Sequence, residues 1–110
     1  MVVRFWSART TQERFPAYLK HFNDNVLPSL RAVDGFLEAR VISQSDGTVV
    51  QFIAETLWGS MESIDRFAGP DRELAVIADE ALHLLTSYDH RVRHYQVDLC
   101  EDHRKTKTSA

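Results

Sequence analysis

The sequence predicts a small α+β domain of ferredoxin-like type, with the element order β-α-β-β-α-β. Alternating apolar and polar residues predict four strands, over residues 2–8, 36–44, 48–57 and 91–99. A long helical pattern separates the first two strands, and a shorter one separates the last two. An Asp-Gly turn joins the middle strands as a β-hairpin. We therefore expect a four-stranded antiparallel sheet with helices on one face.

The size of the chain suits one domain. Its 110 residues are 44% hydrophobic and 10% aromatic, which is enough to bury a small core. We expect the domain to span residues 1–100 and a polar tail to occupy residues 101–110. A domain of this size can gain stability by oligomerising.

The charge of the chain argues against nucleic acid as a partner. The formal net charge is −3, the isoelectric point is about 5.9, and no cluster of Lys and Arg lies inside the expected domain. The single cysteine, Cys100, cannot form an internal disulfide. No signal peptide is recognisable, and no stretch has the roughly 20 apolar residues that span a bilayer. We expect a cytoplasmic protein that does not enter a membrane.

The first strand and helix show clear periodicity. The strand places Val3 and Phe5 on one face and Arg4 and Trp6 on the other. The helical stripe recurs every three or four residues, at Phe15, Leu19, Phe22, Val26, Leu30 and Val33. Thr10 with Glu13 fits a capping box. Pro16 lies late for that start, so either the first turn is irregular or the helix begins nearer Phe15. Pro28 predicts a kink or a break before the last turn, and Asp34-Gly35 ends the helix.

The hairpin and the second helical region each have a distinct pattern. Ile53 shares one face of its strand with Gln51 and Glu55, and the neighbouring strand places Arg40 and Ile42 together. After the hairpin, the sequence predicts a short helix that is capped by Ser60 and stops at Gly69-Pro70. Its apolar stripe comprises Met61, Ile64 and Phe67. Asp79 is a candidate cap for another short helix.

The sheet face away from the helices is expected to be too apolar for water. We expect Trp6, Ile42 and Ile53 on that face. A second copy of the chain is the natural cover, since two such sheets packed face to face form a dimeric α+β barrel. The sequence therefore predicts a homodimer with a mixed polar and apolar interior.

A set of residues spread over the chain resembles one known family. The set comprises Trp6, Asp34-Gly35-Phe36, the run Thr56-x-Trp58-x-Ser60-Met61-Glu62-x-Ile64-x-x-Phe67-Ala68-Gly69, Ala75-Val76, Leu85, Tyr88-Asp89 and His94-Tyr95-x-Val97. Over about residues 3–98 the chain resembles the antibiotic biosynthesis monooxygenase (ABM) domain family. The resemblance implies a dimeric α+β barrel and, for some members, oxygenation of polycyclic aromatic substrates without a cofactor.

The same resemblance implies haem as an alternative ligand, because relatives of the family degrade haem. In those relatives an Asn on the first strand works with a Trp and a His. Here the strand reads Arg4-Phe5-Trp6-Ser7-Ala8, with no Asn. This departure argues against haem degradation.

Five residues are candidates for a site inside the expected barrel. His94 can act as a base or proton shuttle, and Arg40 can stabilise an oxyanion. Trp6 can stack on a flat ligand, Gln51 can hydrogen-bond a carbonyl, and Trp58 can wall the pocket. Each has a structural alternative: dimer packing for Trp6, a core corner for Trp58, an interface position for His94, and cross-strand pairing for Arg40 and Gln51.

These candidates support three functional hypotheses. The first is a monooxygenase acting on a small aromatic or quinone-like organic molecule, without metal or flavin. The second is a non-enzymatic dimeric protein that binds a small ligand or is associated with stress. The third is a haem-binding or haem-degrading enzyme, with His94 or His83 as a possible iron ligand. No metal site is predicted, because the five histidines show no ligand spacing with one another.

Overall fold

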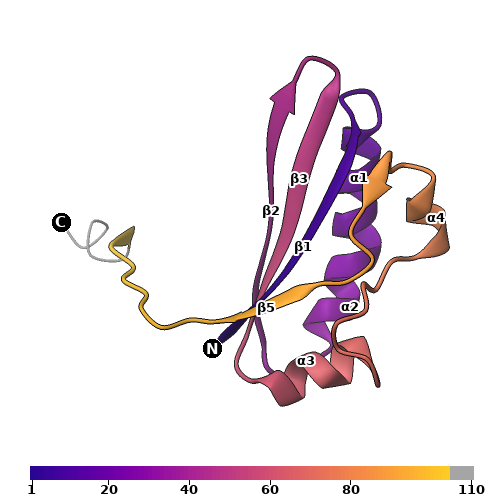
Figure 1. Ribbon diagram of the computed structural model, residues 1–110. Coiled ribbons are helices and arrows are strands. Elements are labelled where there is room, and N and C mark those ends of the chain that lie inside the picture. Colours follow the sequence, from indigo (N-terminus) through magenta and orange to yellow (C-terminus); the bar gives the residue numbers. More distant parts are fainter. Residues whose placement is uncertain (105–110) are drawn as a thin grey trace.

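An antiparallel sheet carries its helices on one face (Figure 1). The computed structural model describes residues 1–104. The sheet order is β2-β3-β1-β4, and β5 also pairs with β1. The strands are β1 (Val2–Thr11), β2 (Phe36–Asp46), β3 (Val49–Trp58), β4 (Ser87–Tyr88) and β5 (Arg93–Gln96). This is the predicted ferredoxin-like arrangement, with two short strands sharing the place of the fourth.

The break between β4 and β5 has a specific cause. Ala8 of β1 pairs with Tyr88 of β4, whereas the other end of β1 pairs with β5. Between these two ladders, the Trp6 indole donates a hydrogen bond to the Asp89 carbonyl at 2.7 Å. The Asp89 N–H also donates to the Ser7 carbonyl. The backbone of Asp89 therefore bonds both the Trp6 side chain and the backbone of β1.

The long helical region divides into three parts. They are α1 (Phe15–His21), a π-helical turn η1 (Phe22–Val26) and α2 (Leu27–Arg31). The start at Phe15 agrees with the position of Pro16, but the capping box is wrong, because Thr10 belongs to β1 and donates to the Leu84 carbonyl. Pro28 lies in the first turn of α2, directly after the π-helical turn. The chain stays helical through Val26 and Leu27, so the helix is irregular before Pro28 but is not broken there.

The helix after β3 matches its sequence pattern. In α3 (Met61–Ala68), the Ser60 hydroxyl accepts a hydrogen bond from the Ser63 N–H, and Gly69 ends the helix with a φ of 83°. The short α4 (Asp79–Leu82) has Ala78 at its N-cap position and no side-chain capping hydrogen bond, so the predicted Asp79 cap is wrong. Part of the predicted tail, residues 105–110, lies outside the described residues.

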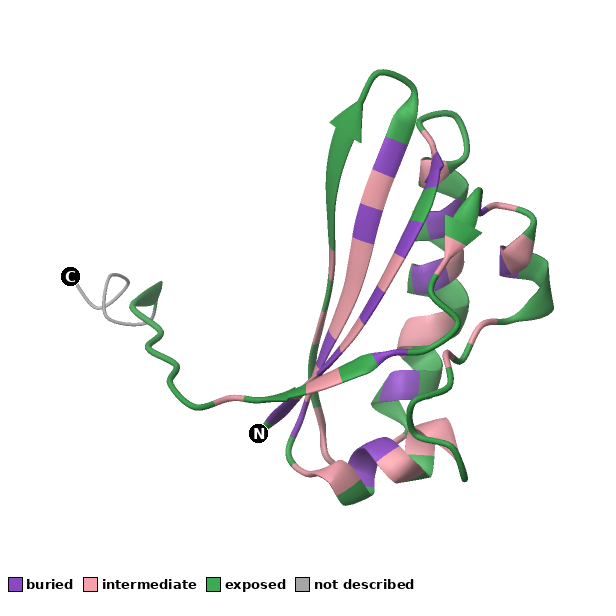
Figure 2. Cartoon of the chain, viewed as in Figure 1, coloured by how far each residue is buried: buried purple, intermediate pink, exposed green. Residues whose placement is uncertain are grey.

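The core lies between the sheet and the helices (Figure 2). Phe52, Trp58 and Ile64 are fully buried there. Trp6 joins them with 8% of its surface exposed, so the prediction that it lies on the open face is wrong. Alternation alone separates the two faces of a strand but does not say which one meets the helices.

The other face of the sheet is uncovered in the single chain. The strand register brings Arg40 beside Glu55, and Ile42 beside Ile53, on this face. Ile42 is 43% exposed and Tyr95 is 51% exposed. The predicted outward position of Ile42 and Ile53 is therefore confirmed. No helix within residues 1–104 is long and apolar enough to cross a membrane.

Candidate functional site

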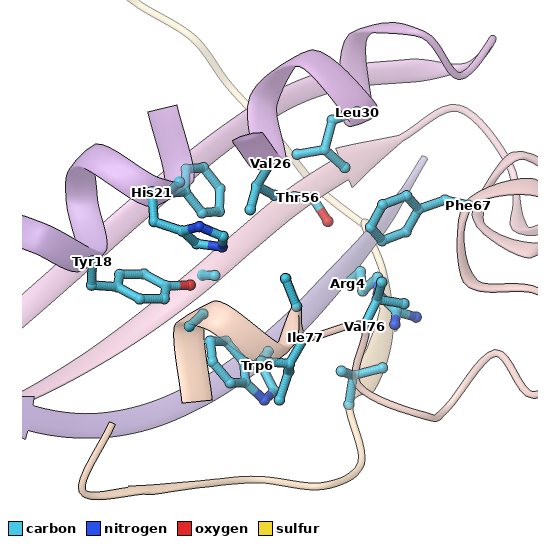
Figure 3. A pocket seen from close by; sticks show the side chains of 15 residues that line it. Arg4, Trp6, Tyr18, His21, Val26, Leu30, Thr56, Phe67, Val76 and Ile77 are labelled. Carbon is cyan, nitrogen blue, oxygen red and sulfur yellow. The ribbon is translucent and has the colours of Figure 1, made fainter. Parts of the chain in front are cut away.

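A cavity of about 70 Å³ lies between the sheet and the helices (Figure 3). Its floor comes from β1 and β3, one wall from α1, η1 and α2, and the other wall from residues 70–78 and α4. We call residues 70–78 the strap. The lining residues are Arg4, Trp6, Tyr18, His21, Phe22, Val26, Leu30, Ala54, Thr56, Phe67, Val76, Ile77, Ala78, Ala81 and Val92.

Aromatic rings fix the walls of this cavity. The centroid of the Tyr18 ring lies 4.5 Å from that of Phe52 and 6.4 Å from those of Trp6 and Phe22. The Trp6 ring is also held by the hydrogen bond from its indole to the Asp89 carbonyl. Such contacts favour one ring orientation, so the cavity has a defined shape.

Polar groups are few and point inward. Figure 3 shows the side chains of Tyr18 and His21 directed into the cavity. Burial raises the pKa of the Tyr18 hydroxyl well above its ordinary value, so this group stays protonated. The Thr56 hydroxyl accepts a hydrogen bond from the Trp58 indole at 2.8 Å. Mostly apolar walls with a few convergent polar groups are typical of small-molecule sites.

Arg4 holds the strap against the sheet. Its guanidinium is buried and donates to the carbonyls of Arg72, at 2.5 Å, and Leu74, at 2.9 Å. It also lies 5.7 Å from the centroid of the Phe67 ring. Burial lowers the pKa of Arg4 to about 10, so the side chain remains a cation at neutral pH.

The strap is an irregular segment held at a few points. Besides the Arg4 contacts, the Ala75 N–H donates to the His90 carbonyl, and the Val92 N–H donates to the Glu73 carbonyl. Val76 lines the cavity although 55% of its surface is exposed. The strap is therefore the wall with the least packing behind it.

The structure brings His94 beside Arg4 rather than into the cavity. Its Nε2 lies 3.0 Å from Nη1 of Arg4 and must accept that hydrogen bond, because a guanidinium only donates. Burial, and then the charges of Arg4 and Arg72, lower the pKa of His94. As a base, His94 would first have to break its bond to Arg4; that role stays a prediction.

Arg40 and Gln51 lie on the opposite face of the sheet from the cavity. Arg40 donates to Glu55 across the hairpin at 2.6 Å, and Gln51 lies in register with Gln44. Trp6 is the one predicted site residue that lines the cavity. One chain therefore does not bring Trp6, Arg40, Gln51 and His94 into a common site.

Trp58 lies behind the cavity, in the core. Its ring packs against Phe36 and Phe67, with centroids 5.4 and 5.6 Å away, and it is fully buried. Its one polar contact is the bond to Thr56, which does line the cavity. A role for Trp58 in ligand binding would act through Thr56.

Sequence reasoning missed the polar cavity residues Tyr18 and His21. The predicted stripe included Leu19, which is exposed, instead of Tyr18. A signal was present, because Phe15, Tyr18 and Phe22 also recur at spacings of three and four. Within residues 1–104, no group of three or more His, Cys, Asp or Glu side chains is placed to hold a metal ion.

Solved structures of other proteins share the fold of this chain. The haem degrader MhuD of Mycobacterium tuberculosis, with two haems in its active site, is 21% identical (TM-score 0.61; 93% of this chain, 100% of that one). A Deinococcus radiodurans protein assigned to the antibiotic biosynthesis monooxygenases is 16% identical (0.63; 93% and 97%). A dimeric ferredoxin-like protein from an uncultured marine organism is 12% identical (0.57; 92% and 97%).

No family model and no curated protein sequence matches the chain. At these sequence identities the structural matches show the fold alone. They agree with the resemblance that the sequence carries. The chain therefore has the ferredoxin-like α+β fold found among antibiotic biosynthesis monooxygenases.

Proposed function

We propose that the protein binds a small aromatic or quinone-like molecule in the cavity and oxygenates it without metal or flavin. The observation that carries the proposal is the cavity itself, with aromatic walls around a few inward polar groups. The fold shared with proteins assigned to the antibiotic biosynthesis monooxygenases supports the reaction class.

The size of the cavity sets a condition on binding. Its volume of about 70 Å³ is less than half of the roughly 150 Å³ that holds benzene in an engineered protein cavity. An aromatic ligand therefore needs one wall to move. The strap is that wall, since it is irregular and Val76 and Leu74 are half exposed.

Haem fits this cavity poorly. The porphyrin ring is far larger than benzene, and the imidazole among the lining residues, His21, already contacts Asn25. Addition of haemin to the purified protein is expected to give no Soret shift, and a saturable shift would contradict this.

The proposed reaction requires a substrate with an acidic C–H group conjugated with a carbonyl, such as the methylene of anthrone. Loss of a proton gives an enolate, which reacts with molecular oxygen. One oxygen atom becomes the new carbonyl of the anthraquinone product, and the other leaves as water with the two hydrogens of the methylene. The buried cation of Arg4 favours the anion in a site of low dielectric.

Oxygen uptake with a panel of anthrones and hydroquinones tests this function. Ala54 lies on the cavity floor, so Ala54→Leu should fill the cavity and abolish uptake. Ile53→Leu, one residue away on the other face, is the matched control and should retain uptake. Circular dichroism checks that both variants fold. Equal uptake in the two variants would place the reaction elsewhere.

The predicted catalytic roles of His94 and Arg40 are tested in the same assay. Loss of uptake in His94→Gln, with retained affinity for the substrate, would support His94 as base or proton shuttle. Arg40→Met tests the electrostatic role across the sheet, which requires a site that a second subunit helps to form.

A second candidate function is ligand binding without turnover. It is favoured by one observation: Tyr18 is protonated, Arg4 is a cation, and neither is a base at neutral pH. Saturable binding of the same panel with no oxygen uptake would select this function over the first.

We also propose that two copies pair through their open sheet faces. Ile42 and Tyr95 are exposed there in the single chain, and Phe5 and Ile53 lie beside them. Apolar groups exposed in this way favour a partner. A structural neighbour is described as a dimeric ferredoxin-like protein, which supports a dimer without specifying its interface. A cytoplasmic location stays a prediction.

A further inference from the structure

The Tyr18 hydroxyl has no hydrogen-bond partner among residues 1–104 and stays accessible from the cavity. The residue as a whole is 4% exposed, and since no buried side-chain oxygen or nitrogen within residues 1–104 lacks a partner, the unpaired hydroxyl oxygen is the accessible part of the side chain. An accessible hydroxyl without a protein partner is free to bond water or a ligand. The hydroxyl points into the cavity, so its partner has to come from the cavity's contents.

His21 presents a second donor beside it. Tyr18 and His21 lie one turn apart on α1, with ring centroids separated by 6.2 Å. The Asn25 side-chain nitrogen lies 3.1 Å from Nδ1 of His21. Because an amide nitrogen donates, Nδ1 accepts, and the proton of the neutral imidazole lies on Nε2. His21 therefore offers an N–H donor next to the Tyr18 O–H donor.

The rest of the cavity offers no anionic competitor for these protons. No Asp or Glu appears among its lining residues, and the remaining charged group is the Arg4 cation. Two donors on an otherwise apolar wall suit a ligand with an acceptor oxygen. A carbonyl oxygen has two lone pairs, so one such oxygen can accept from both donors, and an enolate oxygen accepts more strongly.

We propose that Tyr18 and His21 form a paired donor site that selects aromatic ligands bearing a carbonyl or enolate oxygen. The pair binds that oxygen, while the rings of Trp6 and Phe22 contact the ligand's flat body. The inference rests on the proposed function, since it assumes that a ligand occupies the cavity. It adds the chemical group that the ligand must carry, an acceptor oxygen, and the two residues that bind it.

Two probes of nearly equal shape test the pair. Acetophenone carries a C=O group where α-methylstyrene carries C=CH₂, so they differ in the acceptor oxygen. We expect wild-type protein to bind acetophenone about 3- to 10-fold more tightly, as one net hydrogen bond allows. Binding is measured by NMR titration, with the signals of Val76 and Ile77 reporting that the cavity is occupied.

Variants separate the two donors from the packing of the helix. Tyr18→Phe keeps the ring and removes the hydroxyl, and His21→Leu removes the N–H. Each should reduce the acetophenone preference, and the double variant should bring the two affinities together. His21→Gln keeps an N–H donor and should retain part of the preference. Tyr88→Phe, outside the cavity, is the matched control and should leave the preference unchanged.

The outcomes distinguish the two proposals. Equal affinity of wild-type protein for both probes, or an undiminished preference in the double variant, overturns the donor pair and leaves the cavity as a binding site. Failure of both probes to perturb Val76 and Ile77 overturns the binding cavity and the donor pair together.

Discussion

Arg4 is a buried cation that contacts two backbone carbonyls and two side chains. Its guanidinium donates to the carbonyls of Arg72 and Leu74 and to His94. Arg4→Met keeps the aliphatic stem but leaves these acceptors without a donor. We expect the free energy of unfolding to fall by about 2–4 kcal/mol, measured by urea denaturation.

Arg66→Met is the matched control for this change. Arg66 also donates to a backbone carbonyl, that of Asp34, but it is exposed, so water can replace it. Its loss should cost less than about 1 kcal/mol. Limited proteolysis of Arg4→Met should cut first within the strap. Equal losses of stability in the two variants would show that Arg4 does not hold the strap.

His94 makes stability depend on pH near neutrality. Burial, and then Arg4 and Arg72, lower its pKa below the ordinary value of 6.5, while Glu73 and Asp65 oppose the shift. Just below pH 6.5 the unfolded chain therefore binds a proton that the folded protein resists. Stability from this group is complete above pH 6.5 and is lost as the pH falls toward the lowered pKa.

Urea midpoints at pH 7.5, 6.5 and 5.5 measure this effect. The wild-type protein should lose more stability across that range than His94→Gln, which cannot titrate. Carboxylates titrate in both proteins and cancel in the comparison. His83→Gln, an exposed position, should follow the wild type. Parallel curves for wild type and His94→Gln would remove His94 as the source.

At the residue scale, alternation predicted which side chains share a strand face but not which face is buried. Trp6 and Arg4 were correctly placed together, yet the charge on Arg4 made their face look like the open one. Arg4 is buried because carbonyls about 70 positions away in the sequence accept its protons. Partners at that separation leave no local pattern in the sequence, so the cavity could not be predicted.

The corner where α2 meets β2 depends on Gly35. Its φ is 98°, and a Cβ added there would lie 2.5 Å from the Cβ of Ser63 in α3. Gly35→Ala should therefore push α3 away from the corner and cost about 2–4 kcal/mol. Gly47 has a φ of 62° with no atom near an added Cβ, so Gly47→Ala should cost only about 1 kcal/mol.

Thermal denaturation of the two alanine variants measures the difference. Both lose the freedom of glycine at a positive φ, so a larger shift in Gly35→Ala isolates the contact with Ser63. Ser63→Gly should partly rescue Gly35→Ala, because it removes the Cβ in the way. Equal melting temperatures for the two alanine variants would mean that the corner relaxes without cost.

At the element scale, predictions succeeded where the signal was local. The Ser60 cap, the Gly69 stop and the helix irregularity before Pro28 each depend on residues within one or two turns. The strap showed no periodicity, and its path follows from contacts with β1 and the segment around residues 90–92. The strap, which is the wall that must move to admit a ligand, is therefore the part of the candidate site that the sequence predicts least well.

For the whole molecule, the uncovered sheet face predicts assembly. The face carries apolar side chains at Ile42, Ile53 and Tyr95, opposite the helices that bury Trp6. A face of this kind is stable in water when a second copy covers it. The dimer would also enclose Arg40 and Gln51, which is the one arrangement in which their predicted roles can apply.

Light scattering at micromolar concentration tests the assembly directly. Wild-type protein should show twice the 12.7 kDa mass of the chain. Ile42→Lys with Ile53→Lys places two charges on the face in each subunit, so the pair should give a monomer. Leu19→Lys, at an exposed apolar position on α1, adds charge on the helical side and should remain a dimer. A wild-type monomer, or a dimer that survives the paired lysines, would mean that the open face is not the interface. Oxygen uptake retained by the monomeric variant would then place the chemistry wholly within the helix-side cavity of one chain.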